Sequence, residues 1–193
     1  MAFDLLRLPR IRAGILATVA LFVPVGFYDA TLDRYLTDMG ASNTLISFAF
    51  LAFGIPFALL ASRGGRAADR VGPLRAAVAA SVLMVPITMG YGFVTVPMLV
   101  VVLSGIEGVV QSLGAPAAQA LVASGAPTGR AAAAQGLAGA GSLVVGVVAA
   151  YMAGALYESI GARGMFAIAG GGIALFMAIA LAQGRTRRPS QLS

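Results

Sequence analysis

The sequence predicts an all-α membrane protein that crosses the bilayer six times, and three observations carry this prediction. Apolar residues make up 59% of the 193-residue chain and charged residues only 10%, with a mean hydropathy of +0.91. A soluble domain has about 45–50% apolar and about 25% charged residues. Long apolar runs recur along the chain, with most charged residues between them. The arginines fall between the runs in a pattern that suits an even number of spans.

The first three apolar runs cover residues 11–35, 44–62 and 74–92. Each is close to the ~20 residues that cross a ~30 Å hydrocarbon core. The first run is longer than the apolar part of a cleaved signal peptide, which has about 7–15 residues, so we expect a helix that stays in the membrane. Pro73 lies where the first turn of the third helix accepts a proline.

The other three runs cover residues 97–117, 131–157 and 162–183. The fourth begins at Pro97, again a residue suited to a first helical turn. Three more prolines fall inside spans, at positions 24, 56 and 86, and we expect them to bend their helices locally. The six helices make one bundle over residues 1–193. Its two groups of three, 11–92 and 97–183, must run in opposite directions, so the topology allows an inverted repeat.

Arginine positions predict the orientation. With six spans, eleven of the thirteen arginines fall on one side, and only Arg34 and Arg163 fall on the other. The positive-inside rule then places both termini in the cytoplasm. An Ala-, Gly-, Arg- and Pro-rich chain without Lys is typical of a GC-rich bacterial genome. We therefore expect a multi-pass protein in the lipid bilayer of a bacterial cytoplasmic (inner) membrane.

The missing residue types exclude most enzyme chemistry. The chain has no Cys, His, Lys or Trp. The chain therefore lacks the residues needed for thiolate nucleophiles, Ser–His hydrolysis, Schiff bases and ordinary zinc sites. We expect no enzymatic activity, no cofactor and no metal. The net charge of +6 does not indicate nucleic-acid binding, because cytoplasmic loops of membrane proteins are basic.

The segment ASRGGRAADRVGPLR, residues 61–75, concentrates charge in an otherwise apolar chain. A plain cytoplasmic loop would explain its arginines but not an acid and two glycines at fixed offsets. Its pattern consists of Gly65, Asp69, Arg70, Gly72 and Arg75. This pattern resembles the signature loop between the second and third helices of each half of major facilitator superfamily transporters. A Pro-Leu pair stands where the first-half form has two basic residues, so the segment looks more like the second-half form.

Each residue of the segment suits a physical role. Gly65 would let two helix ends approach closely, and Gly72 would allow a tight turn before the third helix. Asp69 would cap a neighbouring helix or pair with an arginine. The resemblance implies that the loop is a conformational latch, formed when the transporter faces one way and broken when it faces the other.

The resemblance covers the whole chain. Residues 9–42 look like the seventh helix of such transporters with its lead-in, residues 127–146 like the approach to the eleventh, and residues 156–171 like the approach to the twelfth. The family usually has twelve helices, so the chain resembles the C-terminal six-helix half. This implies alternating-access transport of a small organic solute or drug, as in efflux, with a second six-helix half as partner. That half would be a separate chain or a second copy.

Glu107 is the main candidate for chemistry. It lies ten residues into the fourth span, roughly 15 Å along the core, and no arginine of the chain lies at that depth. A carboxylate there is costly and usually faces a cavity or a partner. Glu107 would therefore carry a coupling proton, or it would be a protonated residue that only supports packing. Gln111, one turn further, would bind substrate or Glu107.

The first span carries a second candidate pair, Tyr28 and Asp29. The resemblance implies that the first helix of each group of three lines the central cavity, which would place this pair beside Glu107. Asp29 would otherwise be an ordinary interfacial residue, paired with Arg34.

The fifth span has small residues at spacings of four, which form a ridge for close helix packing in lipid. They are Ala134, Ala138, Ser142, Gly146, Ala150 and Gly154.

The leading hypothesis is a proton-coupled secondary transporter half. The rival is a truncated or split-gene membrane fragment, or an interaction subunit, without transport activity of its own. The sequence leaves both open, together with the substrate, the coupling ion and the transport direction.

Overall fold

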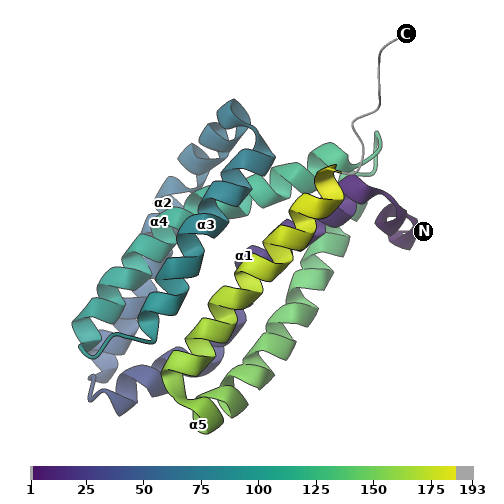
Figure 1. Ribbon diagram of the computed structural model, residues 1–193. Helices are drawn as coiled ribbons and strands as arrows, with labels where there is room; N and C mark the ends of the chain where they lie inside the picture. The colour runs from purple at the N-terminus through teal and green to yellow at the C-terminus, as the bar shows by residue number, and fades with distance from the viewer. Residues whose placement is uncertain (1, 186–193) are drawn as a thin grey trace.

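The structure, a computed structural model, describes residues 2–185 and contains five α-helices after a short 3-10 helix (Figure 1). These elements are η1 (Ala2–Arg7), α1 (Pro9–Asp38), α2 (Asn43–Val71), α3 (Pro73–Tyr91), α4 (Pro97–Gly125) and α5 (Ala131–Arg185). Each of the five helices is long and apolar enough to cross a membrane, and the described residues contain no strand. The predicted all-α membrane class is confirmed.

The last helix, α5, differs from the prediction of two separate spans. It is a single element of 55 residues, interrupted at Gly161, whose backbone angles of φ 71° and ψ 177° are not helical. Glycine adopts positive φ at little steric cost, which is why the chain reverses here. Figure 1 shows the two arms of α5, drawn in green and in yellow, meeting at this bend. The bend lies between the two runs that the sequence separates, but the count of six spans stays a prediction.

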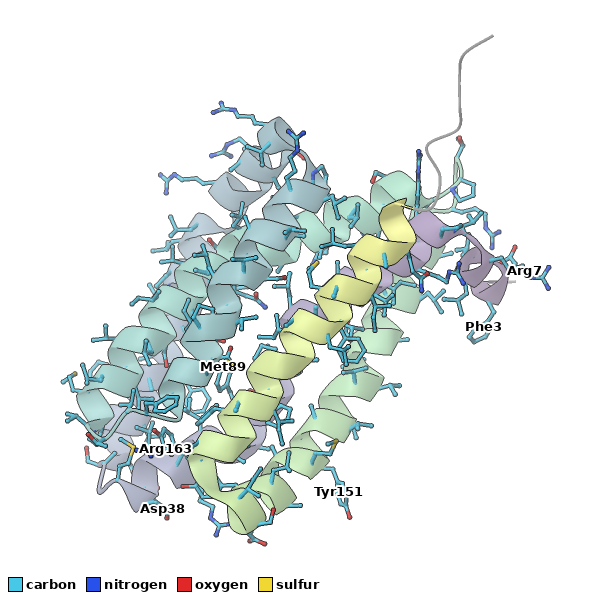
Figure 2. The ribbon with its side chains drawn as sticks, in the orientation of Figure 1. Phe3, Arg7, Asp38, Met89, Tyr151 and Arg163 are labelled. Atoms are coloured by element: carbon cyan, nitrogen blue, oxygen red, sulfur yellow. The ribbon has the colours of Figure 1, made fainter. Side chains whose placement is uncertain are left out.

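The two ends of the bundle carry different connections and different charged residues. Figure 1 shows η1, the last turns of α5 and the α2–α3 and α4–α5 connections at one end of the bundle. Figure 2 shows Arg7 at this end, with Asp38 and Arg163 at the opposite end. Two of the arginines used to predict the orientation, Arg187 and Arg188, lie outside the described residues. The arrangement within residues 2–185 suits the predicted orientation, which stays a prediction.

Single-cysteine labelling tests that orientation. Thr128, between α4 and α5, and Thr95, between α3 and α4, are both exposed and lie at opposite ends of the bundle. Because the chain has no native Cys, Thr128→Cys and Thr95→Cys each introduce a unique thiol. In intact cells an impermeant thiol reagent should label Thr95→Cys and leave Thr128→Cys unlabelled. Labelling of Thr128→Cys alone would reverse the topology.

An ion pair that the sequence analysis missed ties η1 to the α4–α5 connection. The two terminal guanidinium nitrogens of Arg130, Nη1 and Nη2, donate to the Asp4 carboxylate at 2.7 and 2.9 Å. The hydrogen bond and charge of Arg130 lower the pKa of Asp4 from 3.8 to about 2. Since this folded-state pKa is depressed, the contribution of the pair to stability is present above the ordinary Asp pKa. It is lost as the pH falls toward 2.

Two helix ends were wrong in the sequence prediction. The helix expected to end near residue 62 continues as α2 to Val71, so most of the supposed 63–75 loop is helical. Likewise, α4 continues from residue 117 to Gly125. Hydropathy marks where a chain leaves the hydrocarbon, not where its helix ends. Alanines follow in both segments and arginines follow in the first, and both residue types are good helix formers, so the two helices continue beyond their apolar runs.

The turn itself lies where the sequence predicts it. Gly72 has a φ of 93° and ends α2, and Pro73 begins α3 as its first residue. A positive φ favours glycine, and a proline at the first helical position loses no hydrogen bond.

Small residues hold the helices together. Of the five helices α1 is the most buried and α2 the least. One core cluster consists largely of alanines from α1, α3 and α4, which lets these helices lie close together. The tightest contacts are glycines against neighbouring backbone: Gly64 against Ser112, Gly108 against Phe53, and Gly26 against Gly146. These contacts join α2 to α4 and α1 to the first arm of α5.

Candidate functional site

A small cavity of about 50 Å³, called here the Glu107 cavity, lies between α1, α2, α4 and the end of α3. Its lining combines two acids, a serine and several aromatic rings, and consists of Val25, Tyr28, Asp29, Leu32, Ala49, Phe50, Phe53, Tyr91, Ser104 and Glu107. Three of the four residues predicted for a coupling or substrate site, Tyr28, Asp29 and Glu107, therefore meet in one place. They come together because α1 crosses the bundle beside α4.

Glu107 is almost completely enclosed, with 2% of its surface exposed. The Tyr91 hydroxyl donates to its Oε2 at 2.9 Å. The Ser104 hydroxyl lies 3.1 Å from the same phenol oxygen. Because a phenol has one proton, Ser104 is the donor in that second bond, and a short chain runs from Ser104 through Tyr91 to Glu107. Within the described residues Glu107 forms no ion pair.

Tyr91 is held from several sides. Its ring centroid lies 5.1 Å from that of Tyr28 and 5.4 Å from that of Phe166, on the second arm of α5. The Tyr35 hydroxyl lies 2.5 Å from the Tyr91 carbonyl oxygen. Tyr28 in turn donates to the Thr88 hydroxyl on α3 at 3.2 Å. This aromatic cluster fixes the Tyr91 hydroxyl, and with it the donor on Glu107, against three other helices.

Asp29 lies on the open side of the site. It is exposed, and its carboxylate forms no hydrogen bond or ion pair with any residue in the described range 2–185. The pairing of Asp29 with Arg34 considered above is wrong, because Arg34 instead donates to Glu158 at 2.9 Å. Within residues 2–185, Asp29 is thus an unpaired acid on a helix apolar enough to span the membrane, and such residues usually mark function.

Asp29 also borders a second and larger hollow, about 600 Å³ in volume, between α1, the end of α4 and the first arm of α5. We call it the α5 hollow. Its lining is mostly apolar and small: Thr18, Phe22, Val25, Gly26, Asp29, Gln119, Gln135, Ala138, Gly139, Ser142, Leu143, Gly146, Val147 and Ala150. Asp29 and Val25 line both spaces, so the two hollows adjoin along α1.

Gln111 does not lie where the sequence predicts. It is buried, lines neither hollow and does not contact Glu107 through a hydrogen bond. Its Nε2 donates to the carbonyl oxygen of Leu21 at 2.9 Å. Leu21 lies three residues before Pro24 and next to Ala20, whose carbonyl group loses its helical partner because Pro24 has no N–H. Gln111 therefore fastens α4 to α1, while its Oε1 has no hydrogen-bond partner among residues 2–185.

The signature residues lie together at one end of the bundle, but not as a loop. Gly65, Asp69 and Arg70 belong to α2, Gly72 forms the turn, and Arg75 is in the first turn of α3. Asp69 is exposed and does not cap α3, whose start has no side-chain cap. The expected close approach at Gly65 is also misplaced by one residue. A methyl group at Gly65 would be in ordinary contact with Pro116, whereas one at Gly64 would collide with the Ser112 carbonyl.

The predicted ridge on the first arm of α5 holds only in part. Ala134, Ala138 and Ser142 are buried, and Gly146 packs against Gly26 of α1. Beyond this point the buried positions are Ala149 and Ala153, so the buried face turns away from the four-residue spacing. Ala150 instead lines the α5 hollow, and a methyl group at Gly154 would meet nothing within 4 Å. A helix with 3.6 residues per turn moves off a four-residue stripe over several turns.

Sequence reasoning missed Tyr91 and Ser104. Ser104 lies three residues before Glu107 and therefore on the same helical face, a spacing that the sequence displays. Tyr91 carries no such signal, since it ends another helix and meets Glu107 only through tertiary packing.

Tyr91→Phe tests the hydrogen bond to Glu107. Removing the donor leaves a buried carboxyl oxygen unsatisfied, which costs about 1–3 kcal/mol. We expect the free energy of unfolding in mixed micelles to fall by that amount. Tyr151→Phe is the matched control, because Tyr151 is 84% exposed and its change should stay within about 0.5 kcal/mol. Equal, small effects in both variants would mean that the bond does not contribute to stability.

The sequence model of the Major Facilitator Superfamily matches residues 14–193. The chain belongs to the major facilitator superfamily. No curated protein matches it closely enough to count as a relative. Membership in the superfamily makes the chain a multi-pass membrane protein of a transporter family, and such families are generally not enzymes. In this superfamily member, residues 2–185 hold no group of three or more acidic, His or Cys side chains that would bind a metal.

Proposed function

We propose that the chain is one six-span half of a proton-coupled secondary transporter for a small organic solute or drug. The observation that carries the proposal is Glu107, a buried acid held by Tyr91 beside a cavity that also reaches Asp29, an exposed acid on α1. A carboxyl group within a bilayer is costly and usually serves a pathway or a proton relay. Proton gain and loss by Glu107, as the cavity opens to alternate sides, would couple solute to protons.

The length of α5 supports six spans. A straight helix of 55 residues would be about 80 Å long, more than twice the ~30 Å hydrocarbon core. Two spans that meet at Gly161 fit the membrane instead. With six spans, the groups 11–92 and 97–183 run in opposite directions, as inverted repeats do.

A second six-helix half, as a separate chain or a second copy, would cover the open side of α1. Asp29 lies on that side, between a cavity walled by α2 and a hollow walled by α5. Rocking of the two halves would then expose the site to each side in turn. At the cytoplasmic end, Asp69 would pair with the second half in one state only, which is the latch that the family resemblance implies.

Reconstitution tests this function. The assembly purified with the chain is weighed by native mass spectrometry and placed in proteoliposomes that contain a pH-sensitive dye. We expect a mass that accommodates a second half, and proton movement when a transported solute is added. An assembly that moves neither solute nor protons for any member of a broad panel of organic solutes would favour the non-transporting membrane fragment.

A further inference from the structure

We propose that the α5 hollow binds a lipophilic organic cation, with Asp29 as its counter-ion. This inference rests on the proposed transport function and adds the chemical class of the solute. The hollow has a volume of about 600 Å³, within the ~300–1,000 Å³ typical of small-molecule sites. Its walls are largely apolar, from Phe22 and Val25 on α1 and from Leu143 and Val147 on α5. Such walls suit a ligand with a large hydrocarbon surface.

The charge of the lining determines whether the hollow favours a cationic or an anionic ligand. Asp29 is the sole charged side chain that lines the α5 hollow in the described part of the chain. Its carboxylate is exposed and has no partner there, so it is available to a ligand. Asp29 also borders the Glu107 cavity, where Glu107 is the other acid and no arginine contributes. Both adjoining spaces therefore present negative charge, which attracts cations and repels anions.

The hydrogen-bonding groups of the hollow point to the same class. The Thr18 hydroxyl donates to the Gly14 carbonyl at 2.9 Å, and the Ser142 hydroxyl donates to the Ala138 carbonyl at 3.0 Å. Gln135 uses its Nε2 on the Gln119 carbonyl at 2.7 Å. The two hydroxyl donors are thus engaged within the protein, Gln135 has used one of its two amide N–H groups, and the Gln119 side-chain amide offers both a donor and an acceptor. What the lining mainly leaves for a ligand is acceptors and a carboxylate, which an anionic solute cannot use.

Aromatic rings near Asp29 add to the preference. Phe22 lines the α5 hollow, and Tyr28, Phe50 and Phe53 line the adjoining Glu107 cavity. The faces of such rings attract cations, and the attraction grows when water is excluded. A carboxylate set among aromatic and aliphatic walls is suited to a delocalised or quaternary cation, whose charge is weakly hydrated.

The test uses tetraphenylphosphonium as the probe and the full chain in nanodiscs without any pH gradient. We expect saturable binding that Asp29→Asn weakens by at least about tenfold and that Asp29→Glu largely retains. Asp33→Asn is the matched control, because Asp33 lies one turn further along α1, is exposed and lines neither hollow. This control should bind within about twofold of wild type. Tetraphenylborate, an anion of the same shape, should show no dependence on Asp29.

The outcomes separate this inference from the proposed function. Absence of saturable tetraphenylphosphonium binding, or equal binding by Asp29→Asn and wild type, overturns the cation site even if proton-coupled flux of other solutes is found. Binding that depends on Asp29 supports the site even if proteoliposomes show no proton-coupled flux, in which case the transport proposal fails instead. Loss of binding in Asp33→Asn to the same extent as in Asp29→Asn would show a general effect of charge on α1 and would also overturn it.

Discussion

Glu107→Gln should abolish accumulation or extrusion of solute driven by a pH gradient. The neutral amide resembles the protonated acid in size and still accepts the hydrogen bond from Tyr91, so the fold should persist. It cannot release a proton, and the cavity would therefore lose its coupling group. Exchange of solute across the membrane without a gradient should survive, because the amide mimics one of the two states that transport requires. The assay is solute flux in proteoliposomes, with and without an imposed pH gradient.

The control for this experiment is Glu158→Gln. Glu158 is exposed at the far end of the bundle, where Arg34 donates to it at 2.9 Å. Surface ion pairs contribute about 0–1 kcal/mol, so this variant should keep gradient-driven flux. If Glu107→Gln also keeps gradient-driven flux with its normal pH dependence, then Glu107 serves packing alone. Loss of both driven flux and exchange would indicate a damaged fold and would count against a specific coupling role.

Gly108→Ala should destabilise the bundle by about 1–3 kcal/mol or more. A methyl group at Gly108 would collide with the Phe53 carbonyl of α2, and one at Gly64 would collide with the Ser112 carbonyl of α4. Neighbouring backbone cannot give way as a flexible side chain can, so the two helices must separate. Because α2 and α4 both wall the Glu107 cavity, transport should fall along with stability. Gly64→Ala should behave in the same way.

Gly54→Ala is the matched control on α2. A methyl group there would meet nothing within 4 Å, and alanine favours a helix over glycine by about 1 kcal/mol. We therefore expect a neutral or slightly stabilising effect. Unfolding in mixed micelles measures all three variants. Equal stability of Gly108→Ala and Gly54→Ala would show that α2 and α4 are not in close contact at Gly108.

The sequence predicts the parts of this fold that depend on local chemistry. Pro73 and Pro97 mark the starts of α3 and α4, and Gly72 supplies the turn between α2 and α3. Hydropathy locates all five helices that are long and apolar enough to cross a membrane, and the bend at Gly161 falls between the two apolar runs of α5. The same signal places helix ends poorly, because it reports transfer into lipid and not helical hydrogen bonding. That is why hydropathy predicts a loop at the charged end of α2, which is helical.

The candidate site is predictable in part. A lone acid in the middle of a span marks Glu107 from sequence, since the cost of burial makes such residues rare. Its partner Tyr91 is not predictable, because it lies at the end of another helix. Gln111 shares a helical face with Glu107 in sequence, yet its amide bonds to α1 near Pro24. The rotation of each helix about its axis decides which of two neighbouring polar groups faces a cavity. No local sequence pattern predicts that rotation.

The central claim is that the assembly uses a proton gradient to drive solute transport. The solute gradient at which net flux reverses tests this claim most directly. In proteoliposomes with a fixed pH difference of about one unit and no membrane potential, the solute gradient is varied until net flux is zero. One pH unit corresponds to about 1.4 kcal/mol per proton. We therefore predict that wild type reverses at a solute gradient of about tenfold for each proton coupled. Reversal at equal solute concentrations on both sides, whatever the pH difference, would contradict proton coupling.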